Sequence, residues 1–290
     1  MRYVHPEYLI TPTELAAILD DEDLRIIDAT VFLERGNNRM TAASGLERFD
    51  AAHIAGAQFL DLVEAASDTT TGLGFSLPEP GKLEAVFREL GIDANSRVVF
   101  YSTGHMMWAT RAWWLLYYLG HDNIAILDGG FEAWQASGLP VTTEATRRSP
   151  GSFAATPRPE VFANRDLVSA AIGDESVTTV NALTAELHSG DAEFHYGRKG
   201  HIAGSCNLPY DALLEAGRFR SADEIKDALA AKNMLEVPKV ITYCGGGIAA
   251  TVDAFACLLV GQHAVAVYDG SMSEWVSDPN APMATGPDAD

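Results

Sequence analysis

The segment CGGGIA at residues 244–249 has the composition of a loop that could hold a reactive sulfur. Cysteine acts as a nucleophile in its thiolate form, which nearby hydrogen-bond donors and a helix N-terminus favour over the thiol. Three consecutive glycines lack Cβ atoms, so the backbone can curl tightly and aim successive N–H groups at one centre. The sequence therefore predicts that Cys244 is a nucleophile surrounded by backbone amides.

Other functions for this segment fit its residues less well. A flexible turn beside a core cysteine is one alternative, because unreactive cysteine is commonly buried. A phosphate-binding loop would need the pattern GxxxxGK[ST], and no basic residue follows these glycines. A cysteine phosphatase would need an arginine that closes the loop, where this chain has Ala249 and Ala250. Phosphate ester hydrolysis is therefore disfavoured.

The elements on either side of the loop would place Cys244 where ligands usually bind. The β-branched run KVITY at 239–243 predicts a buried strand, and ATVDAFACLLVG at 250–261 has the apolar spacing of a helix. A strand-to-helix turn in an open α/β sheet lies at the carboxyl ends of the strands, which is the usual ligand-binding edge. We expect the nucleophile at that edge.

The sequence contains an internal repeat that includes this loop. Three motifs recur in the same order in the second half of the chain. They are 53–57 (HIAGA) at 201–205 (HIAGS), 97–102 (RVVFYS) at 239–244 (KVITYC), and 127–134 (LDGGFEAW) at 268–275 (YDGSMSEW). Ser102 therefore occupies in the first half the position that Cys244 occupies in the second.

Each half alternates short β-branched runs with helical patterns, which is typical of parallel strands joined by crossover helices. We predict an α/β protein of two domains, each a mostly parallel sheet with helices on both faces. The proline-containing stretch 146–165 is interpreted as a linker between a first domain at 1–145 and a second at 166–290. The aromatic-rich segment 108–118 is expected to pack in the core and between the domains.

The composition argues against several classes of partner. Asp and Glu number 40 against 20 Lys and Arg, which gives the 290-residue chain a formal charge of −20. This charge would repel nucleic acid and anionic lipid, so neither is expected to bind. No secretory pattern and no apolar stretch near the roughly 20 residues that span a bilayer are present, so we expect a cytoplasmic protein without membrane contact. The three cysteines form no CxxC pair, so no zinc site or disulfide framework is predicted.

Taken together, these motifs resemble the tandem rhodanese family, which includes thiosulfate and 3-mercaptopyruvate sulfurtransferases. The resemblance spans nearly the whole chain and includes HIAGA at 53–57, GHIAGSCNLPY at 200–210 and ITYCGGGIAAT at 241–251. It implies two tandem rhodanese-like domains, of which the first is inactive because it carries Ser102. It also implies that Cys244 takes up a sulfane sulfur as a persulfide, without a metal or organic cofactor.

The same resemblance implies the remaining parts of the reaction. The donor would be a small molecule, 3-mercaptopyruvate or thiosulfate, and the acceptor would be cyanide, a small thiol or a protein thiol, in a two-step ping-pong scheme. Backbone amides of the loop would stabilise the thiolate and the persulfide anion. Those amides belong to Gly245, Gly246, Gly247, Ile248 and Ala249.

Departures from the family pattern affect the expected donor. The loop carries no charge, as in the 3-mercaptopyruvate type, but Gly246 stands where that type has a serine. The family's two arginines that grip an anionic donor are replaced by Leu183 and Leu187. Losing two charge-assisted hydrogen bonds could weaken anionic donor binding by about 10²- to 10⁴-fold. Arg198 and Lys199 could restore the missing charge if their loop folds over the site, or they could be solvated surface cations.

Five other residues have both a functional and a structural interpretation. Asp61 matches an acidic family position at the domain interface, where it could assist proton transfer or cap a turn. His53 and His201 could be bases, but their recurrence in both halves favours a shared structural hydrogen bond. Cys206 and Cys257 lie in apolar segments and are predicted to be core residues.

The principal hypothesis from the sequence is a sulfurtransferase that works through a Cys244 persulfide, with 3-mercaptopyruvate slightly ahead of thiosulfate as donor. The alternative is a persulfide carrier that a partner protein loads and that turns over small donors poorly, which the missing arginines favour. A third hypothesis is a catalytically inactive scaffold, in which Cys244 would react as an ordinary thiol.

Overall fold

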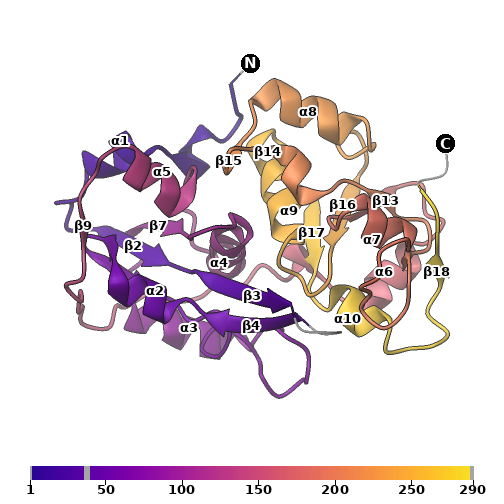
Figure 1. The fold of residues 1–290 in the computed structure, drawn as a ribbon, viewed down its shortest axis with the longest axis horizontal. Helices are drawn as coiled ribbons and strands as arrows, with labels where there is room; N and C mark the ends of the chain where they lie inside the picture. Colours follow the sequence, from indigo (N-terminus) through magenta and orange to yellow (C-terminus); the bar gives the residue numbers. More distant parts are fainter. Residues whose placement is uncertain (1, 36–39, 288–290) are drawn as a thin grey trace.

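The computed structural model describes residues 2–35 and 40–287, and it contains two five-stranded parallel sheets that lie side by side (Figure 1). The first sheet has the order β1 (Leu9–Ile10), β8 (Ile124–Leu127), β7 (Arg97–Tyr101), β2 (Leu24–Asp28) and β6 (Ala57–Phe59). The second has the order β10 (Phe162–Ala163), β17 (Val265–Tyr268), β16 (Lys239–Tyr243), β11 (Val177–Asn181) and β13 (Cys206–Asn207). Every pairing within both sheets is parallel, so the predicted α/β fold class is confirmed.

Short antiparallel pairs accompany the two sheets. They are β3 (Val31–Arg35) with β4 (Met40–Ser44), β5 (His53–Ile54) with β9 (Val141–Thr142), β12 (His201–Ile202) with β18 (Met283–Ala284), and β14 (Leu214–Glu215) with β15 (Arg218–Phe219). Three short 3₁₀ helices in the described chain are η1 (Pro6–Tyr8), η2 (Pro159–Val161) and η3 (Tyr210–Leu213). The pairs β5–β9 and β12–β18 each hold one of the two HIAG motifs, so the internal repeat also has a structural counterpart at this level.

Helices connect the strands in both halves. Those of the first half are α1 (Pro12–Ala16), α2 (Leu46–Ala51), α3 (Pro80–Glu89), α4 (Met107–Tyr118) and α5 (Gly130–Ala136). Those of the second are α6 (Arg165–Ala171), α7 (Ala185–Ser189), α8 (Ala222–Ala230), α9 (Ala250–Leu259) and α10 (Ser271–Trp275). A capping box formed by Ser221 and Glu224 fixes the start of α8, because each side chain accepts from the other's backbone N–H.

Both faces of each sheet are covered, which explains the near-continuous apolar sequence of the strands. A large cluster of buried side chains runs through both halves and contains α3, α4, α8 and α9 residues such as Phe87, Trp113 and Phe255. A second cluster on the outer face of the first sheet includes Trp134 of α5. A third on the outer face of the second sheet includes Trp275 of α10. The prediction of helices on both sheet faces is therefore confirmed.

The two halves meet through α4 and α9, which pack between the sheets (Figure 1). At the centre of this contact the Thr110 and Thr251 hydroxyls are 2.7 Å apart, so they form a buried hydrogen bond. Phe255 on α9 packs edge-to-face on Trp113 of α4, with ring centroids 5.0 Å apart. The prediction that the aromatic-rich segment packs in the core and between the domains is confirmed.

A reciprocal contact flanks the helix pair. The Asp269 carboxylate accepts the Leu77 N–H at 2.7 Å, and the Asp128 carboxylate accepts the Phe219 N–H at 3.0 Å. Asp128 and Asp269 are equivalent positions of the internal repeat. Each domain thus uses the aspartate directly after a core strand, β8 or β17, to hold a segment of the other domain.

The predicted linker runs along the first domain before it reaches the second. The Gly151 N–H donates to the Arg88 carbonyl, and the Thr156 N–H donates to the Leu119 carbonyl. Strand β10 then joins the edge of the second sheet. The boundaries 1–145, 146–165 and 166–290 themselves stay a prediction.

Candidate active site

Cys244 lies at the carboxyl end of β16, in the tight turn that leads into α9. Its side chain is only 3% exposed. The strand KVITY is buried along most of its length because both neighbours, β11 and β17, pair with it. The turn is therefore attached to the rigid centre of the second sheet.

Ser271, the first residue of α10, fixes the shape of this turn. Its Oγ accepts the N–H groups of Cys244 and Gly247, both at 3.0 Å, and donates to the Tyr268 carbonyl at 2.7 Å. Ser271 is fully buried and has a φ of 47°, which is uncommon for a residue with a Cβ. The next two residues also hold the turn. The Met272 N–H donates to the Cys244 carbonyl, and the Ser273 N–H donates to the Gly245 carbonyl.

Removing the Ser271 hydroxyl is expected to destabilise the fold. In a Ser271→Ala protein the N–H groups of Cys244 and Gly247 lose their acceptor, and each buried unpaired donor costs about 1–3 kcal/mol. Urea unfolding should therefore show a loss of about 2 kcal/mol or more. Ser273→Ala is the matched control, because the Ser273 N–H still holds the Gly245 carbonyl when the hydroxyl is gone. Equal losses in the two variants would contradict this role of Ser271.

The remaining amides of the loop are available for a ligand. Within the described chain, the N–H groups of Gly245, Gly246, Ile248 and Ala249 donate to no protein acceptor. The Gly247 N–H differs from the expectation, because it is already bonded to Ser271. Four amides next to Cys244 and the N-terminus of α9 thus form a region where an anionic sulfur would find donors.

Two of the three glycines are required by close neighbours. Gly247 has a φ of 74°, and a Cβ there would lie 2.5 Å from the Asp269 carbonyl oxygen. A Cβ on Gly245 would lie 2.1 Å from the Cζ and the hydroxyl oxygen of Tyr196. Gly246 faces the first domain, since its Cβ would lie 3.7 Å from the Gly74 carbonyl. The loop is therefore enclosed on several sides by residues that the sequence alone does not bring together.

Arg111 of α4 connects the first domain to the loop, and sequence reasoning missed it. Its guanidinium lies 2.7 Å from the Asp269 carboxylate and donates to the carbonyls of Phe75 at 2.6 Å and Gly247 at 3.3 Å. The residue is only 1% exposed. A single arginine in an otherwise apolar helix was the available signal, because a buried charge is almost always paired.

The candidate donor-binding residues have other contacts. The Arg198 guanidinium donates to the carbonyls of Asp278 and Ala281, at 3.1 and 2.9 Å, so it anchors the C-terminal segment rather than the loop. Lys199 is exposed. The Asp61 carboxylate accepts the N–H groups of Val63 and Glu64, so it caps a turn, which is the structural interpretation given for this residue from the sequence. Within the described residues none of the three contacts Cys244, and a role in donor binding stays a prediction for all three.

The two family positions without arginine are occupied by structural residues. Asn181 ends β11, and its side-chain oxygen Oδ1 accepts the Leu183 N–H at 3.0 Å. Leu183 packs against the core, and Leu187 is half-buried on α7. Neither side chain can donate a hydrogen bond to an anionic donor.

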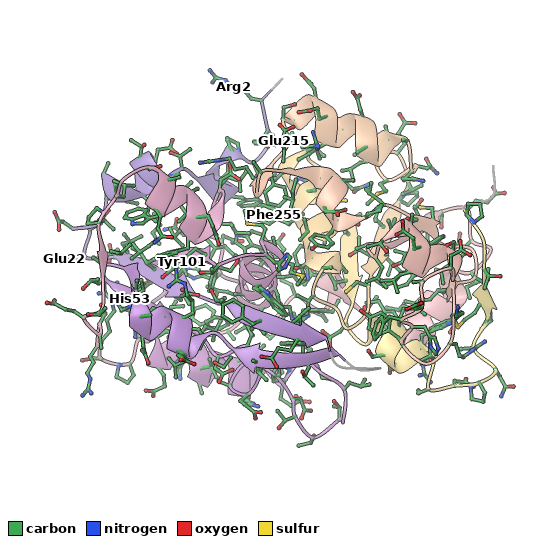
Figure 2. The ribbon with its side chains drawn as sticks, in the orientation of Figure 1. Arg2, Glu22, His53, Tyr101, Glu215 and Phe255 are labelled. Atoms are coloured by element: carbon green, nitrogen blue, oxygen red, sulfur yellow. The ribbon has the colours of Figure 1, made fainter. Side chains whose placement is uncertain are left out.

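The histidines of the HIAG motifs have matching structural roles. His53 Nδ1 bonds the Phe49 carbonyl at 2.8 Å, and its ring stacks on Phe49 beside Tyr101 (Figure 2). His201 Nδ1 bonds the His188 carbonyl at 2.8 Å, and the two rings stack. The predicted shared structural hydrogen bond is confirmed.

The other two cysteines are structural. Cys257 is fully buried on α9, where burial raises the pKa of its thiol. Cys206 is half-buried on the edge strand β13, and its Sγ lies 3.7 Å from the Thr179 carbonyl oxygen. A thiol held in its neutral form in the core is a poor nucleophile, so Cys244 is the chemically distinctive cysteine.

The equivalent loop of the first domain is closed by its own side chains. The Ser102 hydroxyl donates to the His105 carbonyl at 2.8 Å. The Gly104 N–H donates to the Glu132 carboxylate at 2.8 Å, so an internal anion already occupies one of the loop amides. This loop lacks both a thiol and a free set of amides.

Asp253 on α9 is a buried acid without a partner. Neither carboxyl oxygen has a hydrogen-bond partner in the described residues, and the side chain is fully buried. Burial raises the pKa of Asp253 well above its usual value, and the charge of Asp211 on η3 adds to this effect. The group is therefore held as a neutral carboxylic acid behind the loop.

This acid should make stability depend on pH. The unfolded chain releases the Asp253 proton above a pH of about 4, whereas the folded chain keeps it, so folding stability falls as pH rises from there towards the raised pKa. Asp253→Asn removes this titration, and its stability relative to the parent protein should increase by about 1 kcal/mol per pH unit between about pH 5 and 7. Urea unfolding at several pH values measures this difference. Asp227→Asn, at an exposed position of α8, is the control, and a flat difference for Asp253→Asn would contradict the assignment.

The described part of the chain has neither a candidate metal site nor a candidate membrane span. Across residues 2–35 and 40–287, His, Cys, Asp and Glu side chains do not gather in any group of three that could hold a metal ion. The helices over the same residues are all too short or too polar to cross a bilayer.

Comparison with known proteins gives matches over nearly the whole chain. The family model described as a rhodanese-like domain matches residues 11–137 and again 183–278. A relative from Pseudomonas aeruginosa named probable 3-mercaptopyruvate sulfurtransferase is 33% identical over 96% of this chain and 98% of its own length. A relative from Mycobacterium tuberculosis named putative thiosulfate sulfurtransferase SseB is 32% identical over 97% of this chain and 98% of its own.

A solved structure is similar to this chain over most of its length. The crystal structure of SseA from Escherichia coli, described as a 3-mercaptopyruvate sulfotransferase, superposes with a TM-score of 0.81. It is 29% identical and covers 91% of this chain and 98% of its own.

Proposed function

This chain belongs to the rhodanese family, and from that premise we propose that it is a sulfurtransferase that carries sulfur on Cys244 as a persulfide. The observation that carries the proposal is the set of four unbonded amides next to Cys244 at the N-terminus of α9. These donors suit a sulfur that is negative before and after it accepts a second sulfur.

The reaction divides into two balanced half-reactions. In the first, the Cys244 thiolate attacks the outer sulfur of thiosulfate or the thiol sulfur of 3-mercaptopyruvate, a new S–S bond forms, and the donor's S–S or C–S bond to that sulfur breaks. The leaving group departs with the electron pair, as sulfite from thiosulfate or as the enolate of pyruvate from 3-mercaptopyruvate. In the second, cyanide or a thiolate attacks the outer sulfur, and Cys244 leaves as the thiolate.

Among small donors we propose 3-mercaptopyruvate ahead of thiosulfate. The loop residues 244–249 contain no cation, and Leu183 and Leu187 stand where the family has arginines. A singly charged donor depends less on such cations than a doubly charged one does. Two relatives named for 3-mercaptopyruvate support the same order.

A second candidate function is a persulfide carrier that a partner protein loads. The contacts of Arg198 with two backbone carbonyls favour it, because this guanidinium is engaged away from the loop. Small donors would then react slowly while a protein persulfide reacts well. We further propose a cytoplasmic location, where a reactive thiol such as that of Cys244 stays reduced.

Intact-protein mass spectrometry tests the proposal. After incubation with 3-mercaptopyruvate or, separately, thiosulfate, the protein should gain about 32 Da, one sulfur, and a reductant should remove it. A gain from one donor identifies that donor. No gain from either donor would overturn the small-donor enzyme, and loading by a protein persulfide would then establish the carrier.

A further inference from the structure

Tyr196 packs its phenol directly on the cysteine loop. A Cβ on Gly245 would lie 2.1 Å from both the Cζ and the hydroxyl oxygen of Tyr196, and 2.4 Å from its Cε1. The hydroxyl end of the ring thus fills the space over the residue that follows Cys244. A Cβ at residue 245 would therefore have to displace this ring.

The chain around Tyr196 is held in place from two sides. Phe194 packs edge-to-face on the Tyr196 ring, with centroids 5.1 Å apart. Arg198, two residues later, is tied to the carbonyls of Asp278 and Ala281. Gly197 between them has a φ of 127°, which only glycine adopts without strain, and this turn aims the ring at the loop. Tyr196 also belongs to the side chains packed against the outer-face core of the second sheet.

The Tyr196 hydroxyl is a donor without a protein acceptor. Burial raises the pKa of Tyr196, and the charge of Cys244 raises it further, so the phenol stays protonated at neutral pH. Within the described residues this hydroxyl forms no hydrogen bond, either to a carbonyl or to Cys244 Sγ. Tyr210 on η3 differs, because its hydroxyl already lies 3.5 Å from His105 Nδ1. Tyr196 therefore presents an uncommitted O–H beside Gly245, the residue that follows Cys244.

We propose that the Tyr196 hydroxyl donates a hydrogen bond to the outer sulfur of the Cys244 persulfide and thereby stabilises the loaded form. The assignment to the outer sulfur follows from position, because the phenol reaches the loop next to Cys244 without bonding Sγ, and a second sulfur extends about 2.05 Å beyond it. No proton leaves the phenol, so both half-reactions keep the balance given above. The inference rests on the proposed function and adds a catalytic residue to it.

A Tyr196→Phe protein separates the hydroxyl from the ring, since the ring still fills the space over Gly245. The pH profile of alkylation by iodoacetamide is measured on the loaded and on the unloaded protein, each resolved by mass. For the loaded protein the midpoint should move up by about one pH unit, because the persulfide anion loses a donor. For the unloaded protein it should stay unchanged. Tyr117→Phe, a half-buried phenol of α4 that packs on Trp113, is the matched control.

A second variant guards against a purely structural effect. In Gly245→Ala the new Cβ displaces the Tyr196 ring, so the same upward shift is expected with the hydroxyl still present in the chain. A loaded-state midpoint that is identical in Tyr196→Phe and the parent would overturn the inference. Equal shifts in the loaded and unloaded states would overturn it too, because the phenol would then act on Cys244 Sγ. If the parent protein never gains a sulfur, the proposed function fails instead.

Discussion

A Cys244→Ser protein is expected to gain no sulfur from any donor and to lose sulfur transfer by about 10⁴-fold or more, as is typical when a covalent nucleophile is removed. Serine is close to cysteine in size, and the backbone N–H of residue 244 can still donate to Ser271 Oγ. It cannot form a persulfide. Release of thiocyanate from cyanide and the mass gain of about one sulfur are measured on the same preparations, and residual turnover within tenfold of the parent would contradict the assignment of Cys244.

The first domain provides the matched control for this variant. Ser102→Cys places a thiol at the equivalent position, but Glu132 still holds the Gly104 amide and the loop still lacks the glycines of its counterpart. We expect no sulfur on residue 102 when this change is made in the Cys244→Ser background. Loading there would mean that the thiol alone is sufficient and that the free amides are not required.

Replacing Arg111 by Met is expected to destabilise the protein by about 3–5 kcal/mol, because it leaves the partly buried Asp269 carboxylate without its counter-charge. The same change removes the donors that hold the carbonyls of Phe75 and Gly247. Activity should therefore fall under conditions in which the protein is still folded. Urea unfolding gives the free-energy loss, and the rate of sulfur loading gives the effect on the loop.

A double variant separates the charge pair from the packing of its side chains. Arg111→Met with Asp269→Leu removes both charges, so no uncompensated buried charge remains, and stability should recover in part. The hydrogen bond to the Leu77 N–H is still lost, so recovery stays incomplete. Exposed ion pairs contribute up to about 1 kcal/mol. If Arg111→Met alone lowers the free energy of unfolding by less than that, a stabilising buried ion pair between Arg111 and Asp269 is contradicted.

Much of the fold follows from local sequence. KVITY and RVVFYS form the central strands β16 and β7 because β-branched and aromatic side chains suit a sheet that is buried on both faces. The repeat of these strands with LDGGFEAW and YDGSMSEW predicts two sheets of the same order. Cys244 and its glycines were identified in the same way, since a strand, a loop and a helix that follow one another in sequence keep their order in space.

The surroundings of the loop could not be predicted, because they come from segments far away in the chain. Ser271 is 27 residues after Cys244 in sequence and Arg111 belongs to the other domain, so only the packing of the sheets brings them to the loop. Arg198 was predicted either to bind the donor or to be a solvated surface cation, and the sequence did not indicate that its guanidinium bonds carbonyls of the C-terminal segment. Tyr196 was not singled out, since nothing in its neighbourhood in sequence shows that a distant glycine makes room for it.

The reciprocal contacts of Asp128 and Asp269, with Thr110 facing Thr251 between them, have the geometry of an isologous interface joined into one polypeptide. In a dimer of identical subunits a mutation changes the same loop in both subunits. Neither subunit can lose its thiol without the other losing it too. A fused pair is free of that constraint. One copy can give up its thiol and fill its anion site with Glu132, while its Arg111 and Phe75 still enclose the nucleophile of the other. Covalent fusion thus permits the two loops to differ, while a residue of the first half still bonds the loop of the second.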